Sequence, residues 1–172
     1  MAMQIKHGSV TTEPITTSEA KTYLKVDYTD EDTLIGMLIS GIREQVEEFT
    51  GLGIAARDVE YFNDEIPEEI KLPYPVHDSI TEVKINGTAS TAYKKTGLTQ
   101  IIVYPEEQFL SGEDNQGIYI KYKVLGTCPA GLKLEMLKIL DEKYRNRGNT
   151  FEGSISELNE NAYANLAKYC LM

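Results

Sequence analysis

The side chains best suited to catalysis or metal binding lie far apart in this sequence. The two histidines, His7 and His77, are seventy residues apart, and neither has a second ligand at the spacing of a zinc site. The two cysteines, Cys128 and Cys170, form no CxxC pair, so we expect two reduced and partly buried thiols. No GxSxG elbow, Walker loop or GxGxxG motif is present. The sequence therefore predicts no catalytic residue, no cofactor and no metal site.

Carboxylates are abundant, but their spacing favours solvated surface over acid–base chemistry. Glu47 and Glu48 project in different directions from a predicted helix, and Glu44 with Glu48 forms a simple polar face. The group Asp114, Asn115 and Gln116 is too short for an EF-hand, so we expect no calcium site. An enzyme that uses scattered carboxylates remains an alternative, although no motif points to one.

Composition narrows the classes of partner. The 172 residues carry a formal net charge of −10, which argues against a general nucleic-acid binder because such proteins need a basic surface. An acidic surface suits a protein that nucleic acid must pass without sticking. The first 14 residues lack an apolar core and no run of about eighteen apolar residues occurs, so we expect no signal peptide and no membrane span. These features predict a soluble intracellular protein.

The carboxylates Glu44, Glu47 and Glu48 lie on one long helix, which we predict from Asp30 to Thr50. Thr29 and Asp32 have the spacing of a capping box, and Gly51 suits a left-handed C-cap. Glycines inside this helix, Gly36 and Gly41, predict that another helix packs closely there. The apolar stripe recurs every three or four residues, which indicates a buried face: Ile35, Leu38, Ile42, Val46 and Phe49, with Leu34 and Ile39 widening it.

Further helices flank this one. Thr16 and Glu19 form a capping box that predicts a short helix through about Lys25. The acidic start of the long helix argues against a DNA-reading helix-turn-helix, which needs base-reading side chains at that end. A third helix is predicted from Pro129 to Gly148, and a final one from Ser154 to the chain end. We expect the final helix to dock on its own core rather than on a neighbour.

The stretch between the helices has the composition of β-strands. Short runs rich in Val, Ile, Thr and Tyr alternate with turn residues, and Asn86-Gly87 is a strong hairpin signal. We predict strands at 57–62, 79–85, 92–95, 100–104 and 117–125. The predicted fold class is α+β, a small helical bundle with an inserted antiparallel β segment. The predicted domains are a loose arm at 1–14, a helical core at 15–53 with 127–172, and a β-rich insertion at 54–126.

The end of the third helix is basic. Lys143, Arg145 and Arg147 crowd its C-terminal turn, where the helix dipole favours cations. One interpretation is that Arg145 and Arg147 are capping and solvated charges. The other is an interface patch for an acidic neighbour, including another copy of this acidic chain.

The order of three blocks resembles the head–tail connector, or head completion, proteins of long-tailed double-stranded DNA bacteriophages. Residues 15–54 resemble the opening signature of that family, with Glu19-Ala20-Lys21, an acidic cap at 30–32 and Phe49-Thr50-Gly51. Residues 72–83 are similar to its Leu-Pro-x-Pro piece, and 128–148 look like its Pro-started helix ending in Tyr-x-x-Arg. Residues 88–115 and the tail after Gly148 match no block of the family.

The resemblance implies a structural virion or prophage protein. Members of the family form a ring, commonly of twelve copies, below the portal after DNA packaging. The ring extends the DNA channel and joins the head to a downstream neck or tail protein. The expected partners are therefore further copies of the chain, the portal protein and that neck protein. The expected locations are the host cytoplasm during assembly and then the virion neck.

A closed ring needs two complementary faces on each copy. The candidate interface residues are placed on the long helix and on the end of the third helix: Glu44, Glu47, Glu48, Lys143, Tyr144, Arg145 and Arg147. The alternatives are a neck or tail-completion protein of the same module, a non-viral soluble adaptor domain, and the enzyme with unrecognised carboxylates.

Overall fold

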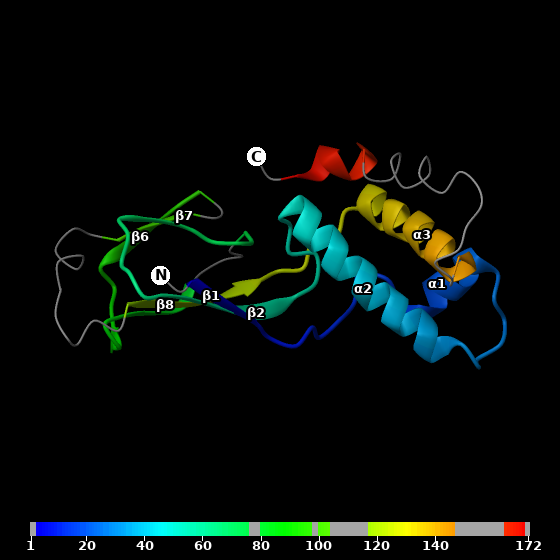
Figure 1. Ribbon diagram of the computed structural model, residues 1–172, viewed down its shortest axis with the longest axis horizontal. Coiled ribbons are helices and arrows are strands. Elements are labelled where there is room, and N and C mark those ends of the chain that lie inside the picture. Colours follow the sequence, from blue (N-terminus) through cyan, green and yellow to red (C-terminus); the bar gives the residue numbers. More distant parts are fainter. Residues whose placement is uncertain (1–2, 76–79, 98–99, 104–116, 147–163, 171–172) are drawn as a thin grey trace. The chain divides into compact units, whose positions relative to one another are not determined.

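The computed structural model describes residues 3–75, 80–97, 100–103, 117–146 and 164–170. Internal contacts divide the chain into two compact units. The β unit comprises Met1–Thr11 and Ala56–Gly126, and the helical unit comprises Thr12–Ala55 and Thr127–Met172. Helices and antiparallel strands are both present, which confirms the predicted α+β class (Figure 1). The predicted domain boundaries stay a prediction, because compact units within one chain are not a test of independent folding.

The described residues of the helical unit include three bounded α-helices and a short 3₁₀ helix. Their bounds are α1 Thr17–Leu24, α2 Asp32–Thr50, α3 Ala130–Arg145 and η2 Ala167–Tyr169. The capping box of α1 is confirmed: the Glu19 backbone N–H donates to Thr16 Oγ1 at 3.2 Å, and the Thr16 N–H donates to Glu19 Oε2 at 2.9 Å. Because the side chains of Thr16 and Glu19 each accept the other residue's backbone N–H, α1 begins where the sequence predicts.

The long helix α2 is continuous, but its start and its buried face differ from the prediction. Its N-cap is Glu31, and no side-chain hydrogen bond caps it, so the Thr29–Asp32 box does not form. Phe49 is 43 % exposed, whereas Arg43 and Glu47 are buried. The inner stripe therefore turns through Ile35, Ile39, Ile42, Val46 and Thr50. At its end, Gly51 adopts φ 71° and donates its N–H to Glu47 O, which confirms the predicted C-cap.

The core of the helical unit collects apolar side chains from all of its helices. The α3 stripe of Leu132, Met136, Ile139 and Leu140 is buried, as predicted. Leu166, near the chain end, lies in the same core and is 0 % exposed. The tail thus docks on its own core, although residues 154–163 of the predicted final helix lie outside the described residues. Pro129 is the N-cap of α3 rather than its first residue, and the C-cap is Asn146.

Helices α2 and α3 run in opposite directions within this unit (Figure 1). The hydroxyl of Tyr144, in the last turn of α3, donates to Glu31 at the start of α2. At the other end, a Cβ on Gly131 of α3 would meet Tyr169, and the neighbouring Cys170 lies 3.5 Å from Phe49 O at the end of α2. Both ends of α2 are thus held by residues of α3 or of the segment near the chain end.

The described strands of the β unit form two antiparallel sheets. A five-stranded sheet has the order β1-β2-β8-β4-β5, and a three-stranded sheet has the order β3-β7-β6. The strands are β1 Met3–His7, β2 Arg57–Asn63, β3 Glu69–Lys71, β4 Ile80–Ile85, β5 Thr88–Ala89, β6 Tyr93–Thr96, β7 Gln100–Val103 and β8 Ile118–Val124. In β8 the residues Ile118, Ile120, Tyr122 and Val124 are buried, as their alternation predicts.

The expectation of a loose arm at 1–14 is wrong for its first part. Residues Met3–His7 pair with Val59–Asn63 across five positions, and the Gly8 N–H donates to Asp58 O at 2.8 Å. The backbone ladder with β2 holds this segment, although its side chains carry little apolar signal. The Asn86-Gly87 turn is confirmed, with φ of 49° and 77° as a type I′ hairpin requires.

Candidate interaction surfaces

The acidic face predicted on α2 divides into an exposed part and a buried part. Glu44 has a 70 % exposed side chain, and Glu48 is exposed one turn later. Glu47 is only 2 % exposed and points into the unit, so its assignment to an outer acidic face is corrected. Its Oε1 accepts from the backbone N–H groups of Ile54, at 2.9 Å, and Ala55, at 3.2 Å. Glu47 therefore holds the chain that leaves α2.

Arg43 organises the carboxylates around it. Its Nε donates to Glu13 Oε2 at 2.9 Å, its Nη1 to Glu47 Oε2 at 3.0 Å, and its Nη2 to Glu44 Oε1 at 3.1 Å. Burial alone would lower the pKa of Arg43, but the charges of Glu13 and Glu47 outweigh it and raise that pKa. Through this cluster α2 binds both the segment before α1 and the segment after Gly51.

The basic end of α3 also divides into inner and outer groups. Tyr144 donates to Glu31 and lies 3.3 Å from the hydroxyl of Tyr28. The hydrogen bond to the Glu31 carboxylate raises the pKa of Tyr144. Lys143 is half-buried, whereas Arg145 has a 69 % exposed side chain paired with Asp141 at 2.7 Å. Arg147 lies outside the described residues. Tyr144 thus makes a contact within the unit, whereas the side chain of Arg145 faces solvent.

Two helix faces of this unit point to solvent. The α2 outer face, as we define it, comprises Met37, Gly41, Glu44 and Glu48, and the α3 outer face comprises Leu134, Lys138, Asp141 and Arg145. On these faces Met37 is 69 % exposed and Leu134 is 46 % exposed. A Cβ at Gly36 or Gly41 meets nothing within 4 Å, so the predicted close helix packing at these glycines is wrong for the described part of this chain.

The residues that could carry chemistry remain separate where they are described. His7 contacts the ring of Tyr74 with centroids 5.7 Å apart, and His77 lies outside the described residues. Cys128 and Cys170 are free thiols, and burial raises the pKa of Cys128. Within the described ranges, no group of three or more His, Cys, Asp or Glu residues could hold a metal ion. In the same part of the chain, no helix has both the length and the apolar character to cross a membrane.

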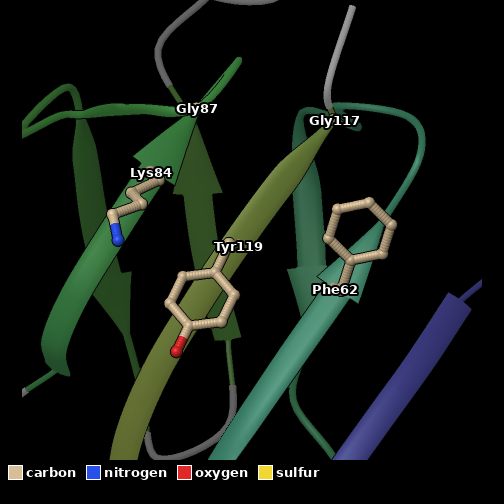
Figure 2. A pocket seen from close by; sticks show the side chains of 5 residues that line it. All are labelled: Phe62, Lys84, Gly87, Gly117 and Tyr119. Carbon is tan, nitrogen blue, oxygen red and sulfur yellow. The ribbon is translucent and has the colours of Figure 1, made fainter.

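A shallow hollow of about 240 Å³ lies on one face of the five-stranded sheet (Figure 2). Phe62 of β2, Tyr119 of β8 and Lys84 of β4 line it beside Gly87 and Gly117. The Lys84 ammonium lies 5.4 Å from the Tyr119 ring centroid and pairs with Glu82 at 2.8 Å. Among the described residues, the lining offers a cation and two aromatic rings and contains no carboxylate, thiol or imidazole.

A family model decides what kind of protein carries these faces. The model of the phage gp6-like head–tail connector proteins matches residues 14–101, which is just over half of the chain. The chain belongs to this family. No curated protein matches it. The matched range covers α1, α2 and the strands from β2 into β7, whereas α3 completes the same compact unit from beyond it.

Solved structures similar to this connector come from the necks and virions of gene transfer agent particles. One is a chain in the neck of an empty particle computed with C6 symmetry, with 11 % identity and a TM-score of 0.76 over 98 % of this chain and 96 % of that chain. Another is from the virion of a native particle, with 11 % identity, a TM-score of 0.75 and the same shares covered. A third is from a native neck computed with C12 symmetry, with 12 % identity and a TM-score of 0.62 over 97 % and 96 %.

The family and the fold together give the connector a structural role in joining head to tail. The family and the matched neck chains are structural parts of particles rather than enzymes.

Proposed function

We propose that this connector assembles as a ring below the portal vertex, extends the DNA channel there and receives the next neck protein. The observation that carries the proposal is the family match combined with a fold shared along 98 % of the chain with particle necks. Those necks were computed with sixfold and twelvefold symmetry. We assign this chain a cyclic assembly of the same kind, formed from copies that wait in the host cytoplasm until a filled head presents its portal.

Charge supports the proposal in two ways. A net charge of −10 keeps a channel-lining protein from adhering to the genome that passes it. The exposed members of the predicted interface set, Glu44 and Glu48 on α2 and Arg145 on α3, carry opposite charges on different helices. A head-to-tail ring requires two such unlike faces on one copy. Glu47 and Tyr144 then act indirectly, by holding the ends of α2 and α3.

The proposal is tested by mixing the full chain with the purified portal ring from the same genome. Mass photometry and negative-stain images are expected to show a complex with several connector copies stacked on the portal axis. Arg145→Glu is expected to lower the number of bound copies while the circular dichroism spectrum stays unchanged. A connector that binds a tail-completion protein but not the portal would overturn the placement. A chain that stays monomeric with both partners would overturn the ring.

A further inference from the structure

The outer faces of α2 and α3 have the same spacing. On α2 the outer face has steps of four, three and four residues: Met37, Gly41, Glu44 and Glu48. On α3 the steps are also four, three and four in either direction along the helix: Leu134, Lys138, the half-buried Asp141 and Arg145. Such spacing keeps side chains on one stripe of a helix. Two helices with these stripes can therefore mesh along about three turns when they lie antiparallel.

The orientation follows from the fold and from the symmetry. Within one copy α2 and α3 are antiparallel and bury their inner stripes in the same core, and their outer faces turn away from that core. A twelvefold ring turns each copy by only about 30° relative to the next. The α3 helix of a neighbour therefore still runs nearly antiparallel to α2. An antiparallel contact between these two faces is thus one that a ring permits.

One of the four facing pairs is complementary in charge when Met37 is aligned with Arg145. This register places Glu44, with its 70 % exposed side chain, opposite Lys138, whose side chain is 46 % exposed. It places Gly41 opposite Asp141, so the glycine leaves room for the Asp141–Arg145 ion pair. Met37 then faces the aliphatic stem of Arg145, and Leu134 lies beside Glu48. The α2 outer face carries no cation, because Arg43 is turned inward.

Gly41 supports this arrangement independently. It costs about 1 kcal/mol relative to Ala in a helix interior, and a Cβ at this position would meet no described neighbour within 4 Å. Close approach of a second helix is the usual structural reason for such a residue. A helix packed on this face would also bury Met37, which is 69 % exposed in one copy.

We propose that the α2 outer face of one copy packs antiparallel against the α3 outer face of the next copy, with Glu44 paired to Lys138. The inference rests on the proposed ring and adds which faces form it and in which register. The occupant of the α2 outer face is thus a second copy of this chain, and the same contact repeated around an axis closes the ring.

A charge exchange tests the pairing. Glu44→Lys and Lys138→Glu are each expected to lower the number of portal-bound copies about tenfold, because a facing pair of like charges opposes assembly. The double variant is expected to restore assembly to near the wild-type level. Within one copy both substitutions place like charges together, at Arg43 and at Glu135. These costs persist in the double variant, so restoration can come only from a contact between copies.

Matched reversals at exposed sites of the β unit, Glu68→Lys and Lys123→Glu, are the controls and are expected to leave assembly unchanged. A second measurement does not depend on charge. Glu48→Cys combined with Leu134→Cys is expected to give covalent multimers with a short bis-maleimide on the portal, whereas wild type, with its two native cysteines, gives none. A wild-type ring that tolerates both single reversals, or a double variant no better than either, would overturn the register and leave the ring standing. Absence of any wild-type ring would instead overturn the proposed function.

Discussion

At the residue scale, the buried charge cluster explains how a highly acidic helix can also be a packing helix. Arg43 forms hydrogen-bonded ion pairs with Glu13, Glu44 and Glu47. Buried ions are tolerated only when they are paired and hydrogen-bonded. Because Glu47 also accepts two backbone N–H groups, the same carboxylate satisfies the turn after α2. The cluster therefore serves the fold, and the outer acids remain available for contacts.

We predict that Arg43→Met lowers the free energy of unfolding by about 3 kcal/mol, since it leaves Glu47 buried without its cation. The matched control is Arg145→Met. Arg145 also pairs with a carboxylate one turn away, but its side chain is 69 % exposed against 8 % for Arg43. The control should change stability by no more than about 0.5 kcal/mol. Urea unfolding followed by circular dichroism measures both, and equal losses would contradict the role of burial.

Glu47 also shows where sequence reasoning reaches its limit. Helical periodicity predicts that charged residues face outward, so it assigns Glu44, Glu47 and Glu48 to one acidic face. The partner that draws Glu47 inward is Arg43 at i−4, and Glu13 that completes the cluster is thirty residues from Arg43. An arginine flanked by carboxylates at i+1 and i+4 was a usable signal for the pair. The involvement of Glu13 is a tertiary contact that no local pattern reveals.

At the element scale, α1 is tied to α3 by an ion pair that responds to acid. Lys133 Nζ of α3 donates to Glu19 Oε1 of α1 at 2.6 Å. This hydrogen bond, together with those from Thr16, lowers the pKa of Glu19 from 4.5 to about 2. A carboxyl group with a lowered folded-state pKa stabilises the fold above its unfolded pKa, and the stabilisation disappears as the pH falls through its folded pKa.

We therefore predict that Glu19→Gln loses stability relative to wild type at pH 6 and that the difference closes between about pH 4.5 and about pH 2. Glutamine retains the capping-box hydrogen bond while removing the charge. Because Glu19 is partly exposed, at 46 % of its side chain, the loss at pH 6 should be about 1 kcal/mol or less. Thermal unfolding across this pH range measures it. A difference that is constant with pH would show that the charge contributes nothing.

The docked tail gives the next prediction at this scale. Leu166 is fully buried among the side chains of the helical core, so Leu166→Ala should lower the free energy of unfolding by about 2 to 4 kcal/mol. Lys168→Ala, two residues on and exposed, is the control and should change it by less than about 0.5 kcal/mol. Urea unfolding compares the two. Similar values would mean that the tail adds nothing to this core.

Most helices and strands can be predicted from the sequence, and the exceptions have physical causes. The alternation of apolar residues predicts β8 and its buried face, and Asn86-Gly87 predicts the hairpin turn that follows β4. The strand β1 was missed because only Ile5 faces the core, so five residues show no alternation long enough to recognise. Its stability comes from pairing with β2, more than fifty residues away. The two-residue β5 is likewise defined only by its partner β4.

At the scale of the whole molecule, an acidic chain in a DNA channel should let the genome pass rather than hold it. Non-specific binding to DNA strengthens with the number of phosphates that the protein's cationic side chains neutralise, because each neutralised phosphate releases counterions. Here the net charge is −10, and several exposed cations are already paired, as Lys84 is with Glu82 and Arg145 with Asp141. We predict no retardation of linear duplex DNA by the full chain at about 10 μM and about 50 mM salt, where such binding would be strongest.

An electrophoretic mobility assay measures this, with a basic protein of similar mass as the positive control. The ring on its portal is expected to behave as the free chain does, because the proposed contact uses Lys138 between copies and exposes no new cation. A shift at this concentration that disappears with added salt would show a local basic surface strong enough to overcome the net charge. The like-charge account of DNA passage would then be wrong, while the contact between α2 and α3 would be unaffected.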